Sequence, residues 1–184
     1  MAKLLLTGAT GHIGSGLRTH FETRGFEVIA PTRAECDLSK SGAVTKFLEA
    51  INFSDVLYLI NNAADQSVAE LKNAKPNEIS SMMQTNFNSI AEIYSFAARN
   101  PANLKSILNI SSIEAINARP GHIIYGASKA ALESLTKSAA MELKTIRTNA
   151  LRLGLISRPG IQSSWPEGVN AWRSEEHTSE LQSH

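Results

Sequence analysis

Near its start the chain reads Lys3-Leu-Leu-Leu-Thr7-Gly8-Ala-Thr-Gly11-His-Ile-Gly14. The apolar run is short and suits a buried strand, and the residues from Ser15 to Arg24 are typical of a helix. A strand, a glycine-rich turn and a helix in this order can hold the pyrophosphate of a dinucleotide. The glycines let the backbone approach the phosphates, and the helix N-terminus offers unpaired N–H groups and a partial positive charge.

The rest of the chain continues this alternation of strands and helices. The apolar patterns predict strands at 3–7, 26–30, 55–61, 105–111 and 147–153, and helices at 12–24, 41–51, 77–98 and 123–144. Alternating elements with continuously apolar strands indicate a parallel sheet that is covered on both faces. The predicted fold class is therefore α/β, a Rossmann-type doubly wound parallel sheet flanked by helices, in one domain over residues 1–172.

A second informative stretch is Tyr125-Gly-Ala-Ser-Lys129, on the last predicted helix. Residues four apart share one face of a helix, about one turn apart. Because an ammonium group near a phenol favours the phenolate, Lys129 is expected to lower the pKa of Tyr125 from its usual value of about 10. Such a tyrosine can give a proton to a carbonyl oxygen or take one from an alcohol. Ser112 can hydrogen-bond the same oxygen.

Taken in order, these motifs resemble the short-chain dehydrogenase/reductase family. The resemblance extends from about Lys3 to about Trp172. The residues that carry it are Thr7-Gly8-x-x-Gly11-x-x-Gly14, Asp37, Asn61-Asn62-Ala63-Ala64, Asn86, Ser112, Tyr125 and Lys129. It implies an NAD(P)-dependent oxidoreductase that transfers a hydride between the nicotinamide and a carbonyl or alcohol substrate.

The resemblance also implies a role for each site residue. Tyr125 would be the acid/base, Ser112 would polarise the substrate carbonyl, and Lys129 would bind the nicotinamide ribose. Asn86 would hold a water in a proton relay with Lys129, and Asp37 would meet the adenine ring. The implied cofactor-binding residues are Gly8, Thr10, Gly11, His12, Ile13, Gly14, Arg33, Asp37, Leu38, Asn62, Ala63, Ala64, Tyr125 and Lys129.

Departures from the family pattern keep other functions open. The Gly-x-x-Gly-x-x-Gly spacing, with His12 inside it, is typical of the sugar-nucleotide epimerase branch. Residues 125–143 instead resemble the ordinary reductase branch and carry more weight. Leu153-Gly154 stands where relatives have Pro-Gly beside the nicotinamide. The alternatives are a sugar-nucleotide epimerase or dehydratase on the same scaffold, and a non-catalytic nucleotide-binding protein.

The end of the second strand, Val28-Ile-Ala-Pro-Thr-Arg33, bears on the choice of cofactor. An acid there would bind the ribose 2′-hydroxyl and favour NAD, but none precedes Glu35. Arg33 can instead pair with a 2′-phosphate through its planar guanidinium, and Thr32 can hydrogen-bond it. NADP is therefore favoured over NAD. The alternative is that Arg33 is a surface loop residue.

The connection after the second strand is unusually short, since only Arg33 to Cys36 precede Asp37. A parallel crossover through a helix needs about a dozen residues. The helix that the family usually has at this point therefore cannot fit. We expect the family's third strand to be short or absent and Asp37 to follow a tight connection.

The last residues of the chain differ in character from the rest. Arg173 to His184 read Arg-Ser-Glu-Glu-His-Thr-Ser-Glu-Leu-Gln-Ser-His, without apolar periodicity, and resemble the translation of a sequencing adapter. We predict a non-native tail at 173–184, with a natural polar tail as the alternative. The domain at 1–172 would then lack the family's C-terminal strand and helices.

Composition argues against several classes of protein. The formal net charge of +1 and the lack of a basic stripe disfavour nucleic-acid binding, and no run reaches the roughly 18 apolar residues of a membrane helix. Cys36 is the single cysteine, so no disulfide or metal site is predicted. We expect a cytoplasmic enzyme with a small-molecule substrate. The helices at 77–98 and 123–144 correspond to those that pair subunits in the family, which suggests a homodimer or homotetramer.

Overall fold

The computed structural model describes residues 1–100 and 103–156. The chain divides into two compact units, Met1–Leu153 and Gly154–His184. Every helix and strand given below belongs to the first unit. The predictions about the 173–184 tail, and about the C-terminal strand and helices, fall outside the described residues.

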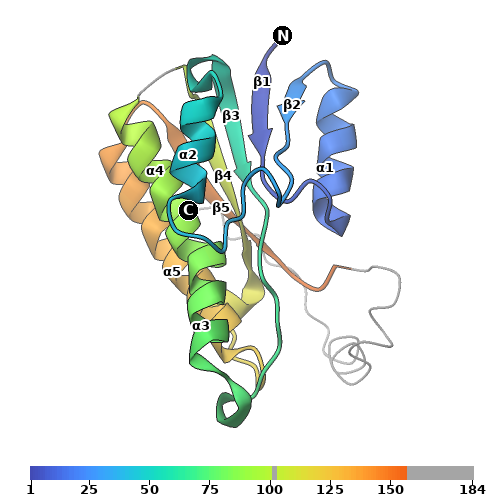
Figure 1. Cartoon of the computed structure of the whole chain (residues 1–184), viewed down its shortest axis with the longest axis vertical. Coiled ribbons are helices and arrows are strands. Elements are labelled where there is room, and N and C mark those ends of the chain that lie inside the picture. Colours follow the sequence, from blue (N-terminus) through green and yellow to red (C-terminus); the bar gives the residue numbers. More distant parts are fainter. Residues whose placement is uncertain (101–102, 157–184) are drawn as a thin grey trace. The chain divides into compact units, whose positions relative to one another are not determined.

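The first unit is built on a parallel sheet of five strands in the order β2-β1-β3-β4-β5 (Figure 1). The strands are β1 (Lys3–Leu6), β2 (Glu27–Ile29), β3 (Val56–Asn61), β4 (Ser106–Ser112) and β5 (Arg147–Leu153). Each neighbouring pair runs parallel. All five strands lie where the apolar runs predict them, so the Rossmann-type fold is confirmed.

Helices connect these strands on the two sides of the sheet. They are α1 (His12–Glu22), α2 (Ala43–Ala50), α3 (Pro76–Met83), α4 (Ser89–Arg99) and α5 (Ile123–Glu142), with short 3-10 turns η1 (Phe53–Asp55), η2 (Leu71–Asn73) and η4 (Ile113–Ala115). In the described part of the chain, none of the helices is long and apolar enough to cross a membrane.

The alternation of side chains along β1 explains why both faces of the sheet are covered. Leu4 and Leu6 point into a cluster with Leu17 and Phe21 of α1. Leu5 points the other way, into the larger cluster that includes side chains of α2, α4 and α5. Successive side chains of a strand face opposite sides, and burial of each such leucine stabilises the fold by roughly 1.5–3 kcal/mol.

Two connections position the residues expected to form the site. After β2 the chain turns at once, because the N–H groups of Glu35 and Cys36 both donate to the carbonyl oxygen of Thr32, at 3.2 and 2.9 Å. The described residues between β2 and β3 contain no further strand, in agreement with the predicted tight connection. The helix predicted at 77–98 is present, and the π-helical segment η3 (Gln84–Asn88) lies within it between α3 and α4, with helical backbone angles at both of its ends.

Candidate active site

The glycine-rich turn joins β1 to α1 at the carboxyl edge of the sheet. Gly8 has a φ of +68°, which strains any other residue, and a Cβ there would lie 2.7 Å from Cα of Ala63. A Cβ on Gly14 would collide with the carbonyl oxygen of Gly8. Both positions therefore need glycine, and they give the turn the close backbone packing that a pyrophosphate site requires.

The segment that follows β3 is fastened to this turn. The hydroxyl oxygen of Thr7 accepts hydrogen bonds from the backbone N–H groups of Asn62 and Ala63, both at 3.1 Å. The side-chain amide of Asn62 donates to the carbonyl oxygens of Thr7 and Gly8, also at 3.1 Å. The structure thus brings together two of the predicted cofactor-binding segments, 8–14 and 62–64.

The other predicted cofactor residues near the turn are placed by neighbouring elements. Thr10 is exposed in the turn itself, and His12 and Ile13 form the first turn of α1. Leu38 is half-buried and packs against the main hydrophobic core. Thr10 and His12 are therefore exposed to solvent, whereas Leu38 contributes to packing.

The residues after β2 make ionic contacts among themselves. Nε of Arg33 lies 3.4 Å from Oδ1 of Asp37. Hydrogen bonding from Ser39, assisted by the nearby Arg33, lowers the pKa of Asp37. Thr32 donates its N–H and its hydroxyl to Oε2 of Glu35, both at 2.8 Å. Arg33 and Thr32, expected to meet a 2′-phosphate, therefore already contact carboxylates of the chain itself.

The three residues expected to handle the substrate oxygen lie close together. Ser112 ends β4, and Tyr125 and Lys129 lie one turn apart on α5. Tyr125 exposes 7% of its surface, Ser112 8% and Lys129 only 2%. Nζ of Lys129 lies 5.7 Å from the centre of the Tyr125 ring and donates to the carbonyl oxygen of Ile110 at 2.7 Å.

The pKa of Tyr125 differs from the sequence prediction. Burial raises the pKa of the phenol and the Glu114 carboxylate adds to the rise, although hydrogen bonding with Ser112 lowers it. Burial also lowers the pKa of Lys129 to about 8. The prediction that Lys129 lowers the pKa of Tyr125 is therefore wrong for this geometry. Its ammonium group lies over the ring and hydrogen-bonds Ile110, and its own charge is disfavoured by burial.

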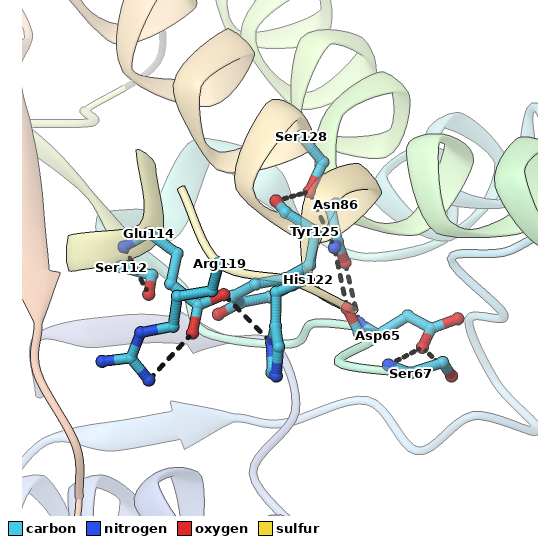
Figure 2. A network of polar contacts seen from close by, with 9 residues as sticks. All are labelled: Asp65, Ser67, Asn86, Ser112, Glu114, Arg119, His122, Tyr125 and Ser128. Carbon is cyan, nitrogen blue, oxygen red and sulfur yellow. Dashed lines mark hydrogen bonds and ion pairs between the residues drawn. The ribbon is translucent and has the colours of Figure 1, made fainter. Parts of the chain in front are cut away.

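Asn86 lies fully buried in the π-helical segment η3. Its Oδ1 accepts a hydrogen bond from the N–H of Asp65 at 2.7 Å, and its Nδ2 donates to the carbonyl oxygen of Asp65 at 2.8 Å and to the hydroxyl of Ser128 at 3.0 Å. The Ser128 hydroxyl in turn donates to the carbonyl oxygen of Tyr125 at 2.7 Å. Asn86 therefore ties the loop after β3 to the helix that carries the tyrosine (Figure 2).

Sequence interpretation missed three charged or titratable residues beside Tyr125, namely Glu114, Arg119 and His122 (Figure 2). Oε1 of Glu114 lies 3.8 Å from Nη1 of Arg119, and Oε2 lies 3.0 Å from Nδ1 of His122. The ring of His122 meets that of Tyr125 edge to face, with centres 6.4 Å apart. A signal was available, because Glu114 stands two residues after Ser112 and His122 three before Tyr125.

A second buried carboxylate fixes α5 against the sheet. Glu133 accepts a hydrogen bond from the Ser111 hydroxyl at 2.7 Å and two from the Arg152 guanidinium, at 2.8 and 2.6 Å. Burial favours a higher pKa for Glu133, but the hydrogen bonds from Arg152 and Ser111 outweigh it and lower the pKa. Over residues 1–100 and 103–156, no cluster of three or more histidine, cysteine or acidic side chains is arranged to hold a metal ion.

Comparison with known sequences identifies the family. The sequence model of the short chain dehydrogenase family matches residues 32–169. The chain is 31% identical to the 3-oxoacyl-[acyl-carrier-protein] reductase FabG of Chlamydia trachomatis serovar D, over 91% of this chain and 72% of the relative. The chain spans 53% of the carbonyl reductase family member 4 of Danio rerio and 73% of the FabG of Chlamydia pneumoniae, so it covers about half to three quarters of these two relatives.

Solved structures agree on the fold. ElxO with NADP bound has a TM-score of 0.76 at 24% identity, over 91% of this chain and 79% of that one. A 4-hydroxyisoleucine dehydrogenase complexed with NADH has a TM-score of 0.77 at 24% identity, over 89% and 80% of the two chains. The strand order, the glycine turn and the family match over 32–169 lead to one conclusion. The chain belongs to the short chain dehydrogenase family.

Proposed function

We propose that the chain is an NAD(P)-dependent oxidoreductase that transfers a hydride between C4 of the nicotinamide and a carbonyl or alcohol carbon. The observation that carries this proposal is the position of Ser112 and Tyr125 at the edge of the sheet where the glycine-rich turn follows β1. In parallel α/β sheets, ligands bind outside the carboxyl ends of the strands. A nucleotide on the turn and a substrate at Tyr125 would therefore share one site.

In the proposed mechanism the bound nicotinamide supplies or accepts the hydride, and residues of the chain move the proton. During reduction Tyr125 gives its proton to the carbonyl oxygen while Ser112 hydrogen-bonds that oxygen. During oxidation the Tyr125 phenolate takes the proton of the alcohol. Lys129 binds the ribose hydroxyls and Asn86 supports the proton relay, as the family resemblance implies. A positioned acid/base of this kind contributes about 10²–10⁴-fold to a rate.

The electrostatics of Tyr125 bear on the pH dependence of each direction. A phenol keeps its proton at neutral pH, and burial raises the pKa of Tyr125 further. A protonated phenol is a donor, so the form of Tyr125 that carbonyl reduction needs is the form present near neutral pH. Oxidation needs the phenolate and should become faster as the pH rises.

We propose a preference for NADP over NAD, based on Arg33 and Thr32. A guanidinium can hold a phosphate through paired hydrogen bonds. In the chain alone, however, Thr32 donates to Glu35 and Arg33 pairs with Asp37. A 2′-phosphate must compete with these two carboxylates, so the expected preference for NADP is modest.

Transfer of deuterium tests the proposed reaction directly. The chain is incubated with a panel of aldehydes and ketones and with NADPH that carries deuterium on either face of C4, and the products are analysed by mass spectrometry. The proposal predicts an alcohol with deuterium on the former carbonyl carbon, from one of the two labelled cofactors. Saturable NADPH binding without deuterium in any product would contradict it.

The glycine spacing favours a second candidate, a sugar-nucleotide epimerase or dehydratase. Gly8, Gly11 and Gly14 have the spacing of that branch. Such an enzyme recycles its cofactor, so it would convert a sugar nucleotide without net loss of NAD(P)H. A non-catalytic nucleotide-binding protein would bind the cofactor and convert neither kind of substrate.

A further inference from the structure

Glu114 is a largely buried carboxylate in the segment that connects the two proposed oxygen-binding residues. It belongs to η4, directly after β4, and its side chain exposes 10% of its surface. One carboxylate oxygen faces Arg119 at 3.8 Å and the other faces His122 at 3.0 Å. A carboxylate so far removed from water requires partners of this kind, and Figure 2 shows all three side chains gathered beside Tyr125.

The backbone of Glu114 is held on both sides by the proposed site. Its N–H donates to the hydroxyl oxygen of Ser112 at 3.2 Å. Its carbonyl oxygen packs against α5 at Gly126, where a Cβ would lie only 2.7 Å away. Gly126 directly follows Tyr125, so these contacts hold the backbone of Glu114 beside the tyrosine, and the ionic partners hold its carboxylate.

The charged groups around Tyr125 come from three elements. The turn η4 and the loop after it supply Glu114, Arg119 and His122. Helix α5 supplies Lys129, whose Nζ lies 5.7 Å from the ring centre. The loop after β3 supplies Asp65, whose Oδ1 accepts hydrogen bonds from the N–H and the hydroxyl of Ser67. Among residues 1–100 and 103–156, Glu114 is the acidic group that raises the pKa of the phenol, in addition to burial.

We propose that Glu114 is a positioning residue that acts through Tyr125: it holds Arg119 and His122 beside the tyrosine, and its charge sets the pH range in which Tyr125 exchanges its proton. This inference rests on the proposed role of Tyr125 as the acid/base. A negative charge near a phenol opposes loss of its proton. Glu114 therefore keeps Tyr125 protonated to higher pH, and Arg119, which pairs with the same carboxylate at 3.8 Å, would screen part of its charge.

The matched pair Glu114→Gln and Arg119→Gln tests the direction in which each charge shifts the proton exchange of Tyr125. The first removes the negative charge while keeping the shape, and the second removes the compensating positive charge. In the profile of kcat/KM for alcohol oxidation against pH, the rise should move to lower pH in Glu114→Gln and to higher pH in Arg119→Gln. Each shift should be about half to one pH unit, as expected for one partly screened charge a few ångströms away.

A measurement without turnover separates this proposal from the proposed function. The chain contains three tyrosines, so the ultraviolet titration of tyrosinate, minus that of the Tyr125→Phe variant, isolates Tyr125. Its midpoint should fall in Glu114→Gln and rise in Arg119→Gln. These shifts without any oxidation or reduction would contradict the oxidoreductase while retaining the electrostatic role of Glu114.

Two outcomes would overturn the proposal for Glu114. One is an unchanged titration midpoint of Tyr125 in a folded Glu114→Gln variant, even if kcat falls, because a purely structural role lowers activity without moving the profile. If Glu114→Gln does not fold, as judged by circular dichroism, the titration midpoint of Tyr125 in Arg119→Gln becomes the test. An unchanged or lowered midpoint in Arg119→Gln would then overturn the proposal.

Discussion

The β1–α1 turn and the β4–α5 segment are built in opposite ways. In the turn, Gly8 and Gly14 omit side chains so that backbones can approach each other. In the β4–α5 segment, Glu114, Tyr125 and Lys129 bury polar or ionisable side chains next to one another. Residue type alone therefore reveals the first region, whereas the properties of the second depend on which groups become neighbours in three dimensions.

The largest effect is expected where backbone packing alone forms the site. Gly14→Ala should abolish measurable NADPH binding, because the new Cβ collides with the carbonyl oxygen of Gly8 and distorts the turn. Gly16→Ala is the matched control: it lies in the same helix, nothing lies within 4 Å of its Cβ, and alanine is the better helix former by about 1 kcal/mol. Fluorescence titration with NADPH measures both variants. Equal affinities of the two variants for NADPH would contradict the proposal that close backbone packing forms the nucleotide site.

The buried ammonium of Lys129 should make the free energy of unfolding depend on pH. Its pKa is about 8 in the folded chain, against about 10.4 when unfolded. Between these values the unfolded chain binds a proton that the folded chain does not, so the free energy of unfolding should rise with pH, by up to about 3 kcal/mol. Lys129→Met should remove this rise and make the chain more stable at pH 7, while suppressing turnover.

Urea denaturation at several pH values between about 7 and 10 measures this effect. Other groups also titrate in this range, so the informative quantity is the difference between the native chain and Lys129→Met at each pH. That difference should shrink as the pH rises. A constant difference would mean that Lys129 is not desolvated as its position indicates.

The smallest effects are expected at the exposed contacts after β2. Glu35→Ala removes the oxygen that accepts from the N–H and hydroxyl of Thr32 and should increase the affinity for NADPH about three-fold, the range of exposed ionic contacts. Arg33→Ala should lower the affinity for NADPH by a similar factor and leave that for NADH unchanged. Titration of each variant with NADPH and with NADH measures the ratio of the two affinities. If the NADPH/NADH ratio stays constant in both variants, the proposed preference for NADP is wrong.

Most of the fold could be predicted because its signals are local. The strand runs, the glycine turn and the short connection after Arg33 depend on residue type and spacing, and the structure agrees with each of them. The π-helical segment between α3 and α4 could not be predicted, since residues 84–88 keep the side-chain pattern of an ordinary helix. Within this segment Asn86 hydrogen-bonds Asp65 and Ser128, which are distant in the sequence.

The candidate site could be located from the sequence, but its electrostatics could not. Tyr125 and Lys129 are one turn apart, as predicted, yet spacing on a helix does not say how deeply a pair is buried. Burial raises the pKa of one and lowers that of the other. The spacing of Glu114 to Ser112 indicates that the two residues are close, but the influence of Glu114 on Tyr125 depends on the fold of the turn after β4.

Replacement of Tyr125 by phenylalanine tests the central claim most directly. Tyr58→Phe is the control, because Tyr58 lies on β3 and packs edge to face on Phe26. With the carbonyl substrate identified by deuterium transfer, Tyr125→Phe should lose turnover by about 100-fold or more while binding NADPH as tightly as the native chain, and Tyr58→Phe should change neither. Near-native turnover in Tyr125→Phe would contradict the assignment of this tyrosine as the acid/base.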